Sequence, residues 1–142
     1  MDSIDAARRS RNMQRIGSKN TSPELLVRRI VRDLGFTGYR LHRRDLPGKP
    51  DLAWIGRKSA IFVHGCFWHA HDCAEGSRKP QSNQTYWLPK LERNRLRDER
   101  HLRSLLDAGW RVLVVWECEL KNQSSLRDRL ALFLRGGAVH ER

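Results

Sequence analysis

Ten consecutive residues, 64–73, concentrate the reactive side chains of this 142-residue chain. They contain three of its six histidines and two of its three cysteines, together with Phe67 and Trp68. Histidine changes charge near neutral pH, and imidazole and thiolate are the usual zinc ligands. The two aromatic side chains either pack over a metal-binding loop or contact a ligand. We therefore expect the rest of the chain to fold into a framework that holds this segment.

Charge and cysteine content narrow the class of protein. Lysine and arginine total 28 against 16 acidic residues, a net charge of +12. This excess favours a polyanionic partner, nucleic acid first, although a ribosome-associated or membrane-surface role also fits. No apolar run is long enough to span a membrane, and residues 1–16 lack the apolar region of a signal peptide. We expect a cytoplasmic protein with reduced thiols, for which an odd cysteine count indicates metal binding.

Patterns of apolar residues predict an α/β fold with a single domain over residues 21–142. Residues 1–20 form a basic arm that is either disordered or ordered by contact with DNA. The predicted elements are, in order, a helix (21–34), three strands (39–42, 51–55 and 59–64), a helix (87–108), a strand (111–116) and a helix (124–134). The last strand is apolar along its centre, which is typical of burial within a sheet.

Three acidic residues are candidates for catalytic or metal-binding roles. Glu24 occupies the capping-box position of the first predicted helix and suits either a cap or a catalytic or metal-binding role. Asp51 opens the predicted hairpin and, if its strands pair about the intervening turn, comes to lie beside Val63 and His64. Asp98 lies on the apolar face of the long helix, where a carboxylate needs a partner. That partner is either a buried arginine or a histidine that Asp98 orients.

The thiols and imidazoles of the central segment predict a zinc site, because a Cys3His set closes a tetrahedral structural site. The expected ligands are Cys66, His71, Cys73 and Cys118. His64 or His69 could take the place of His71. The histidines that remain would lie beside Asp51, and a carboxylate with two histidines on a basic protein suits Mg²⁺-dependent phosphodiester hydrolysis.

Four blocks of this sequence, residues 11–13, 46–51, 61–69 and 109–118, resemble the very short patch repair (Vsr) DNA mismatch endonuclease family and occur in its order. The resemblance implies a restriction-endonuclease-like α/β fold of the PD-(D/E)xK type, with a central mixed sheet flanked by helices and a structural zinc site. It implies a strand-specific nick 5′ of the thymine in a T·G mismatch, which arises when 5-methylcytosine deaminates. A cytosine-5 methyltransferase in the same cell would then set the sequence context.

The resemblance also implies roles for individual residues. The implied catalytic residues are Asp51, His64, His69, Asp98 and Glu24, with Asp98 paired to His69. Mg²⁺ would be bound by Asp51 and the backbone carbonyl of Val63, and structural Zn²⁺ by Cys66, His71, Cys73 and Cys118. The implied DNA contacts are Met13 in the minor groove and the aromatic wedge Phe67, Trp68 and Trp87 on the major-groove side. Apart from the resemblance, we expect Lys49 and residues 74–86 to contact the bases that flank the mismatch.

The chain departs from the best-known members of the family at one position and from the wider nuclease fold at a pair of positions. The best-known members carry threonine in place of Val63, which weakens metal binding only if the ligand is the hydroxyl rather than the backbone carbonyl. The acid-x-lysine pair of the wider nuclease fold is replaced here by Val63 and Gly65. This replacement fits the histidine-based variation of the family.

We expect a nucleoid-associated monomer that acts on double-stranded DNA containing a T·G mismatch. Mismatch-repair factors and a repair DNA polymerase would act downstream of the nick. One alternative is a related DNA nuclease with different site or mismatch specificity. The other is a zinc-dependent DNA-binding module without catalysis.

Overall fold

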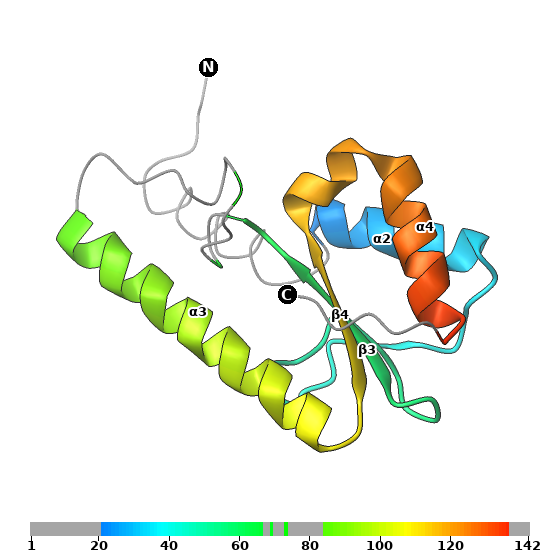
Figure 1. Ribbon diagram of the computed structural model, residues 1–142, viewed down its shortest axis with the longest axis horizontal. Helices are drawn as coiled ribbons and strands as arrows, with labels where there is room; N and C mark the ends of the chain where they lie inside the picture. The colour runs from blue at the N-terminus through cyan, green and yellow to red at the C-terminus, as the bar shows by residue number, and fades with distance from the viewer. Residues whose placement is uncertain (1–20, 67–68, 70–72, 74–83, 137–142) are drawn as a thin grey trace, which may run out of the picture.

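A four-stranded sheet with helices on both faces forms the centre of the molecule (Figure 1). The computed structural model describes residues 21–66, 69, 73 and 84–136. The strands are β1 (Arg40–Leu41), β2 (Leu52–Trp54), β3 (Ser59–His64) and β4 (Arg111–Trp116). The helices are α2 (Ser22–Asp33), α3 (Gln84–Asp107), the short 3₁₀ helix η1 (Glu117–Lys121) and α4 (Gln123–Leu134). The predicted arm, residues 1–20, lies outside the described residues.

The sheet is mixed, as predicted. Its strands lie in the order β1-β2-β3-β4, antiparallel between β1 and β2 and between β2 and β3, and parallel between β3 and β4. A parallel pair needs a crossover connection, and α3 lies within the segment that joins β3 to β4. The expected α/β class with helices flanking a central sheet is therefore confirmed, whereas the PD-(D/E)xK assignment stays a prediction.

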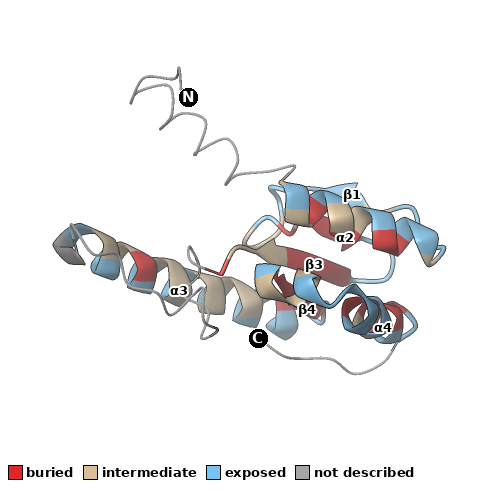
Figure 2. Cartoon of the chain, turned by 90° about the horizontal axis from the view of Figure 1, so that it is seen from above, coloured by how far each residue is buried: buried red, intermediate tan, exposed pale blue. Residues whose placement is uncertain are grey.

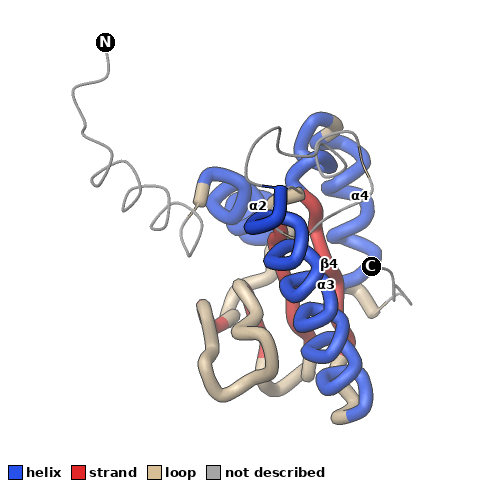
Figure 3. Tube along the Cα trace, turned by 90° about the vertical axis from the view of Figure 1, so that its left-hand side faces the viewer, coloured by secondary structure: helices blue, strands red, loops and turns tan. Residues whose placement is uncertain are grey.

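Two apolar clusters cover the two faces of the sheet. On one face, α2 and α4 pack against residues that include Ile61 and Val115, with Phe133 fully buried among them. On the other face, Leu105 of α3 packs with Phe62 and Val114. Figure 3 shows α3 in front of the strands, with α2 and α4 behind it. Side chains alternate between the faces along a strand, so successive residues of β3 reach different helices.

The long helix α3 reaches beyond the sheet at its N-terminal end (Figure 2). Pro89 lies inside this helix, in its second turn, and cannot donate the backbone hydrogen bond to the carbonyl of residue 85. The helix ends beside Gly109, which has φ +87, a conformation that favours glycine. None of the helices described in the structure is long and apolar enough to cross a membrane.

The hairpin register differs by one residue from the simplest expectation. Leu52 pairs with Ile61, so the strand positions continue with Asp51 beside Phe62 rather than Val63. The Asp51 side chain nevertheless reaches one residue further, because its Oδ2 accepts a hydrogen bond of 2.7 Å from the backbone N–H of Val63. The predicted proximity of Asp51 to the end of β3 is therefore confirmed.

Candidate active site

Two groups of acids and histidines lie on opposite sides of the C-terminal end of β3. On the side of α2 the group is Glu24, His42 and Asp51. On the side of α3 it is His64, His69 and Asp98. Within each group the candidate ligand atoms lie within 4.8 Å of one another.

Asp51 is positioned by the start of β2 and by its hydrogen bond from Val63. Burial raises the pKa of its carboxyl to about 7, and the hydrogen bond from Val63 acts in the opposite direction. The charge of Glu24 adds to the rise. A divalent cation would offset the cost of a buried carboxylate, and carboxylate oxygen is the ligand type that Mg²⁺ prefers. Asp51 therefore fits the predicted metal-binding role.

Glu24 is buried at the start of α2, with only 2% of the residue exposed. Thr21 caps this helix, since its side chain accepts a hydrogen bond of 3.3 Å from the backbone N–H of Glu24. The Glu24 carboxylate itself accepts from Arg28, one turn along the helix, and lies 2.7 Å from Nε2 of His42. The predicted N-cap at Thr21 is thus confirmed, and the side chain of Glu24 lies in the cluster with His42 and Asp51.

His69 and Asp98 form the pair that the helix pattern predicted as one of two options. Nδ1 of His69 and Oδ2 of Asp98 are hydrogen bonded, and the imidazole rings of His64 and His69 stack with centroids 3.8 Å apart. Burial alone would raise the pKa of Asp98, but the hydrogen bond and charge of His69, with smaller contributions from His64 and Arg97, bring it below its usual value. Asp98 therefore stays ionised near neutral pH.

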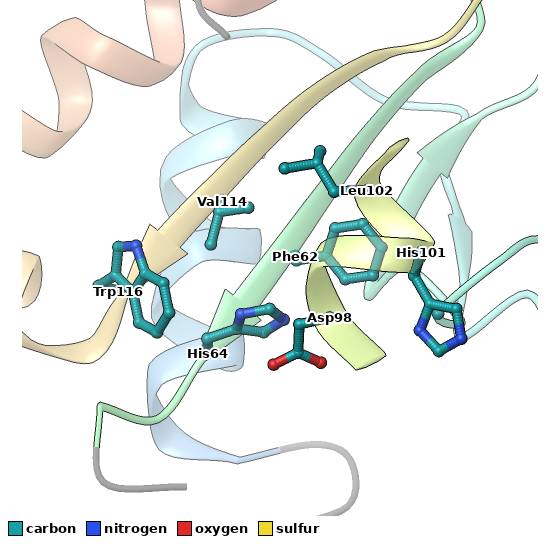
Figure 4. Close-up of a pocket in the computed structure, with 8 residues that line it drawn as sticks. Phe62, His64, Asp98, His101, Leu102, Val114 and Trp116 are labelled. Carbon is teal, nitrogen blue, oxygen red and sulfur yellow. The ribbon is translucent and has the colours of Figure 1, made fainter. Parts of the chain in front are cut away.

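Close packing fixes the ring of His64. His64 ends β3 beside Trp116, its partner in β4, and the two rings meet edge to face at 5.2 Å. Figure 4 shows His64 and Asp98 pointing into one small cavity, of about 30 Å³, with His101 at its far side. This cavity adjoins a larger cleft of about 730 Å³.

The larger cleft contains both histidines of the α3 side and Asp51. Its other wall is the loop over residues 44–49, including Arg44 and the predicted DNA-contacting residue Lys49. Arg97 of α3 adds a further cation. A cleft lined by cations, carboxylates and histidines suits a phosphate-containing substrate.

Three cysteines lie together at the edge of this site. The Sγ atoms of Cys66, Cys73 and Cys118 are within 4.8 Å of one another, and the backbone N–H of Cys118 donates to Sγ of Cys66 at 3.4 Å. Burial raises the pKa of the Cys66 thiol to about 12, so an uncharged thiol is favoured there unless a cation is bound. Tetrahedral zinc holds its sulfur ligands about 3.8 Å apart, and the three thiols fit such a site with little movement.

Comparison with known proteins decides the family. The family model described as DNA mismatch endonuclease Vsr matches residues 1–75. The type II nicking enzyme V.XorIIP of Xanthomonas oryzae pv. oryzae is 48% identical over 129 residues, which cover 91% of this chain and 93% of that protein. This chain belongs to the Vsr family. As a Vsr-family protein it is a DNA endonuclease.

Two further Vsr relatives cover most of the chain. The type II nicking enzyme V.NmeAIP of Neisseria meningitidis is 42% identical over 134 residues, 94% of each chain. The DNA mismatch endonuclease Vsr of Escherichia coli K12 is 38% identical over 127 residues, 89% of this chain and 80% of that protein. The resemblance read from four blocks of the sequence is thus confirmed.

The structure gathers most of the predicted Vsr site residues and leaves others undescribed. Around the end of β3 lie Glu24, Asp51, Val63, His64, Cys66, His69, Cys73, Asp98 and Cys118. Trp87 stands apart from them on α3, eleven residues before Asp98, which corresponds to roughly 16 Å along a helix. Met13, Phe67, Trp68, His71 and residues 74–83 lie outside the described residues.

Sequence reasoning missed two histidines of this Vsr chain. His42 follows β1 and contacts Glu24, and His101 of α3 lines both cavities. A signal for His42 was present, because antiparallel pairing of residues 39–42 with residues 51–54 brings it opposite Asp51. His101 gave no such signal, because its neighbours in the cleft come from a loop whose path the sequence pattern does not define.

Proposed function

We propose that this Vsr-family endonuclease nicks the thymine strand of a T·G mismatch in double-stranded DNA, 5′ of the thymine, in a reaction that depends on Mg²⁺. The observation that carries the chemistry is the convergence of Asp51 with the His64, His69 and Asp98 group in one cationic cleft. The mismatch specificity rests on the family model and on the Escherichia coli relative, whose names state mismatch cleavage.

Asp51 and the backbone carbonyl of Val63 would hold Mg²⁺ at the end of β3. The cation would supply positive charge that offsets the charge gathering on the phosphate oxygens. Because the proposed second ligand is the backbone carbonyl of Val63, the change from threonine to valine does not remove it. The Val63 side chain packs against the apolar cluster on the α2 side, which suits valine.

His69 would act as the general base. The hydrogen bond from Nδ1–H to the ionised Asp98 fixes the tautomer, so Nε2 is left as an acceptor for a proton from water. The parallel ring of His64, inclined by only 3° to that of His69, would assist at the phosphate or the leaving oxygen. Asp98 thus positions and polarises the base without contacting the substrate.

Structural Zn²⁺ would be held by Cys66, Cys73 and Cys118, with His71 as the fourth ligand. The sites of Cys66 and Cys118 follow the adjacent ends of β3 and β4, so the metal would tie the segment after β3 to the sheet. Metal analysis of the folded, purified chain should find close to one zinc per molecule. A folded chain without zinc would refute this site.

The test of function is cleavage of a strand-labelled duplex with one central T·G pair, with and without Mg²⁺, beside the matched C·G duplex. We expect a cut in the thymine strand of the mismatched duplex only, and only with Mg²⁺. Asp51→Ala should abolish the cut while the chain still binds DNA. Wild-type cleavage by Asp51→Ala would overturn the metal assignment.

A second candidate is a nicking enzyme of different specificity. It is favoured by the names of the two relatives at 48% and 42% identity, which state nicking without a mismatch. A panel of matched and mismatched duplexes separates the two functions. Nicking of matched DNA at a rate similar to that of the T·G duplex would favour this second candidate.

A further inference from the structure

The strand register places His42 directly opposite Asp51. In the β1–β2 pair Arg40 faces Ala53 and Leu41 faces Leu52, so the next position beyond the strands joins His42 to Asp51. The backbone N–H of His42 donates to the Asp51 carbonyl at 3.3 Å, which continues the pairing. The backbone of Asp51, the proposed metal-binding residue, is therefore hydrogen bonded to the backbone of His42.

The backbone of His42 adopts a left-handed conformation to make this contact. Its φ is +50, which costs a residue with a Cβ roughly 1–2 kcal/mol, although histidine tolerates it better than most. Such a conformation persists where surrounding contacts hold it, and it is enriched at functional sites. In this site the imidazole contacts Glu24 of α2.

The imidazole of His42 lies between two carboxylates. Its Nε2 is 2.7 Å from Oε2 of Glu24 and 4.0 Å from Oδ1 of Asp51. Glu24 is 2% exposed and also accepts from Arg28, so it is an acceptor and His42 supplies the proton of their hydrogen bond. A nitrogen that carries this proton has no lone pair for a cation, and Mg²⁺ prefers oxygen ligands.

We propose that His42 is a positioning residue of the metal site, which links Glu24 to Asp51 and holds the Asp51 carboxylate toward the end of β3. Arg28 and His42 both restrain the Glu24 carboxylate by hydrogen bonds, and His42 reaches Asp51 through its backbone N–H and through the 4.0 Å approach of Nε2 to Oδ1. This inference deepens the proposed function and rests on Asp51 as the cation carboxylate. Outer partners of metal ligands typically contribute about 10- to 100-fold in metal affinity or activity.

The test uses the full chain with its zinc and two substitutions. His42→Gln keeps an N–H donor on the side chain, whereas His42→Ala removes it. Binding of Mn²⁺, followed by the electron paramagnetic resonance of the free ion, reports on the site without cleavage. We expect His42→Ala to weaken Mn²⁺ binding about 10-fold, and His42→Gln to recover most of it. Arg40→Ala, an exposed substitution on the same strand, should leave Mn²⁺ binding unchanged.

Cleavage provides a second readout. The Mg²⁺ concentration for half-maximal rate should rise in His42→Ala, while the rate at saturating Mg²⁺ and the affinity for DNA without Mg²⁺ stay close to wild type. If His42→Ala does not fold, His42→Leu, which also lacks the side-chain donor, takes its place in the comparison with His42→Gln. Wild-type Mn²⁺ affinity in His42→Ala, or equal losses in both variants, would overturn the positioning role.

Asp51→Ala separates this inference from the proposed function. If Asp51→Ala binds Mn²⁺ as wild type does, the metal assignment itself fails and takes the role of His42 with it. If Asp51→Ala loses Mn²⁺ binding while both His42 variants keep it, only the inference about His42 fails.

Discussion

The hydrogen bond to Asp98 determines which ring nitrogen of His69 carries the proton. An ionised carboxylate accepts a hydrogen bond from Nδ1–H and leaves Nε2 with its lone pair, as the proposed general base requires, and the lowered pKa of Asp98 keeps the carboxylate ionised at neutral pH. The side chain that sets the chemistry of this histidine lies 29 positions away in the sequence.

Asp98→Asn should therefore slow nicking with little effect on DNA binding. An amide can donate as well as accept, so the tautomer of His69 is no longer fixed, and we expect a loss of roughly 10²- to 10⁴-fold in the single-turnover rate. Glu99→Gln, the adjacent position on α3, is the matched control and should cleave normally. A wild-type rate in Asp98→Asn would contradict the base assignment.

The raised pKa of Asp51 predicts that the stability of the fold depends on pH in buffer without Mg²⁺. The pKa of Asp51 rises from 3.8 to about 7 on folding, so the folded state binds more protons between these values and stability falls as pH rises from about 4 to 7. Asp51→Asn removes this dependence. Between pH 5 and 7, wild type should lose roughly 2 kcal/mol of unfolding free energy relative to Asp51→Asn.

Urea unfolding of both proteins at the two pH values measures this difference. Saturating Mg²⁺ should reduce it, because a cation that binds only the folded state stabilises the ionised carboxylate. A constant difference between the two proteins across this pH range would show that Asp51 does not carry the raised pKa.

At the scale of elements, the strands were the most predictable part. The predicted bounds of β3 and β4 match those observed, because both strands are short β-branched runs between turns. Apart from the end of α4 at Leu134, which matches, the helix ends shifted by one to three residues, since helices fray and their ends depend on tertiary contacts. Asp98 was recognisable from its apolar helix face, whereas the loop over residues 42–50 has no periodicity, and its contacts with α3 could not be predicted.

Gly48 shows how that loop is held against the sheet and α3. Its φ is +77, and a Cβ there would lie 3.0 Å from Cβ of His101 and 3.0 Å from the Phe62 ring. Gly48→Ala should destabilise the fold by about 1–3 kcal/mol, through backbone strain and overpacking together. Gly56→Ala, in the β2–β3 turn with no atom within 4 Å of the added Cβ, is the control for urea unfolding. Equal effects of the two substitutions would contradict the tight contact.

For the whole molecule, the net positive charge and the cations that line the cleft have different parts in DNA binding. A net charge of +12 attracts DNA from any direction, but only cations beside the scissile phosphate can hold the backbone over Asp51 and the histidines. The cleft places Arg44, Lys49 and Arg97 around these groups, whereas Arg127 lies exposed on α4, across the sheet from α3. Substitutions of the cleft cations and of Arg127 should therefore change the salt dependence of DNA binding to different extents.

Each phosphate contact contributes about 0.9 to the slope of log affinity against log salt concentration. Lys49→Gln should lower the magnitude of that slope by about 1, because it removes a cleft cation that would contact the DNA backbone in the proposed complex. Arg127→Gln should leave the slope unchanged, since long-range attraction alone releases no bound counterion. Equilibrium binding to a T·G duplex without Mg²⁺, over a range of salt concentrations, measures both. Equal slopes for the two variants would place the DNA outside this cleft.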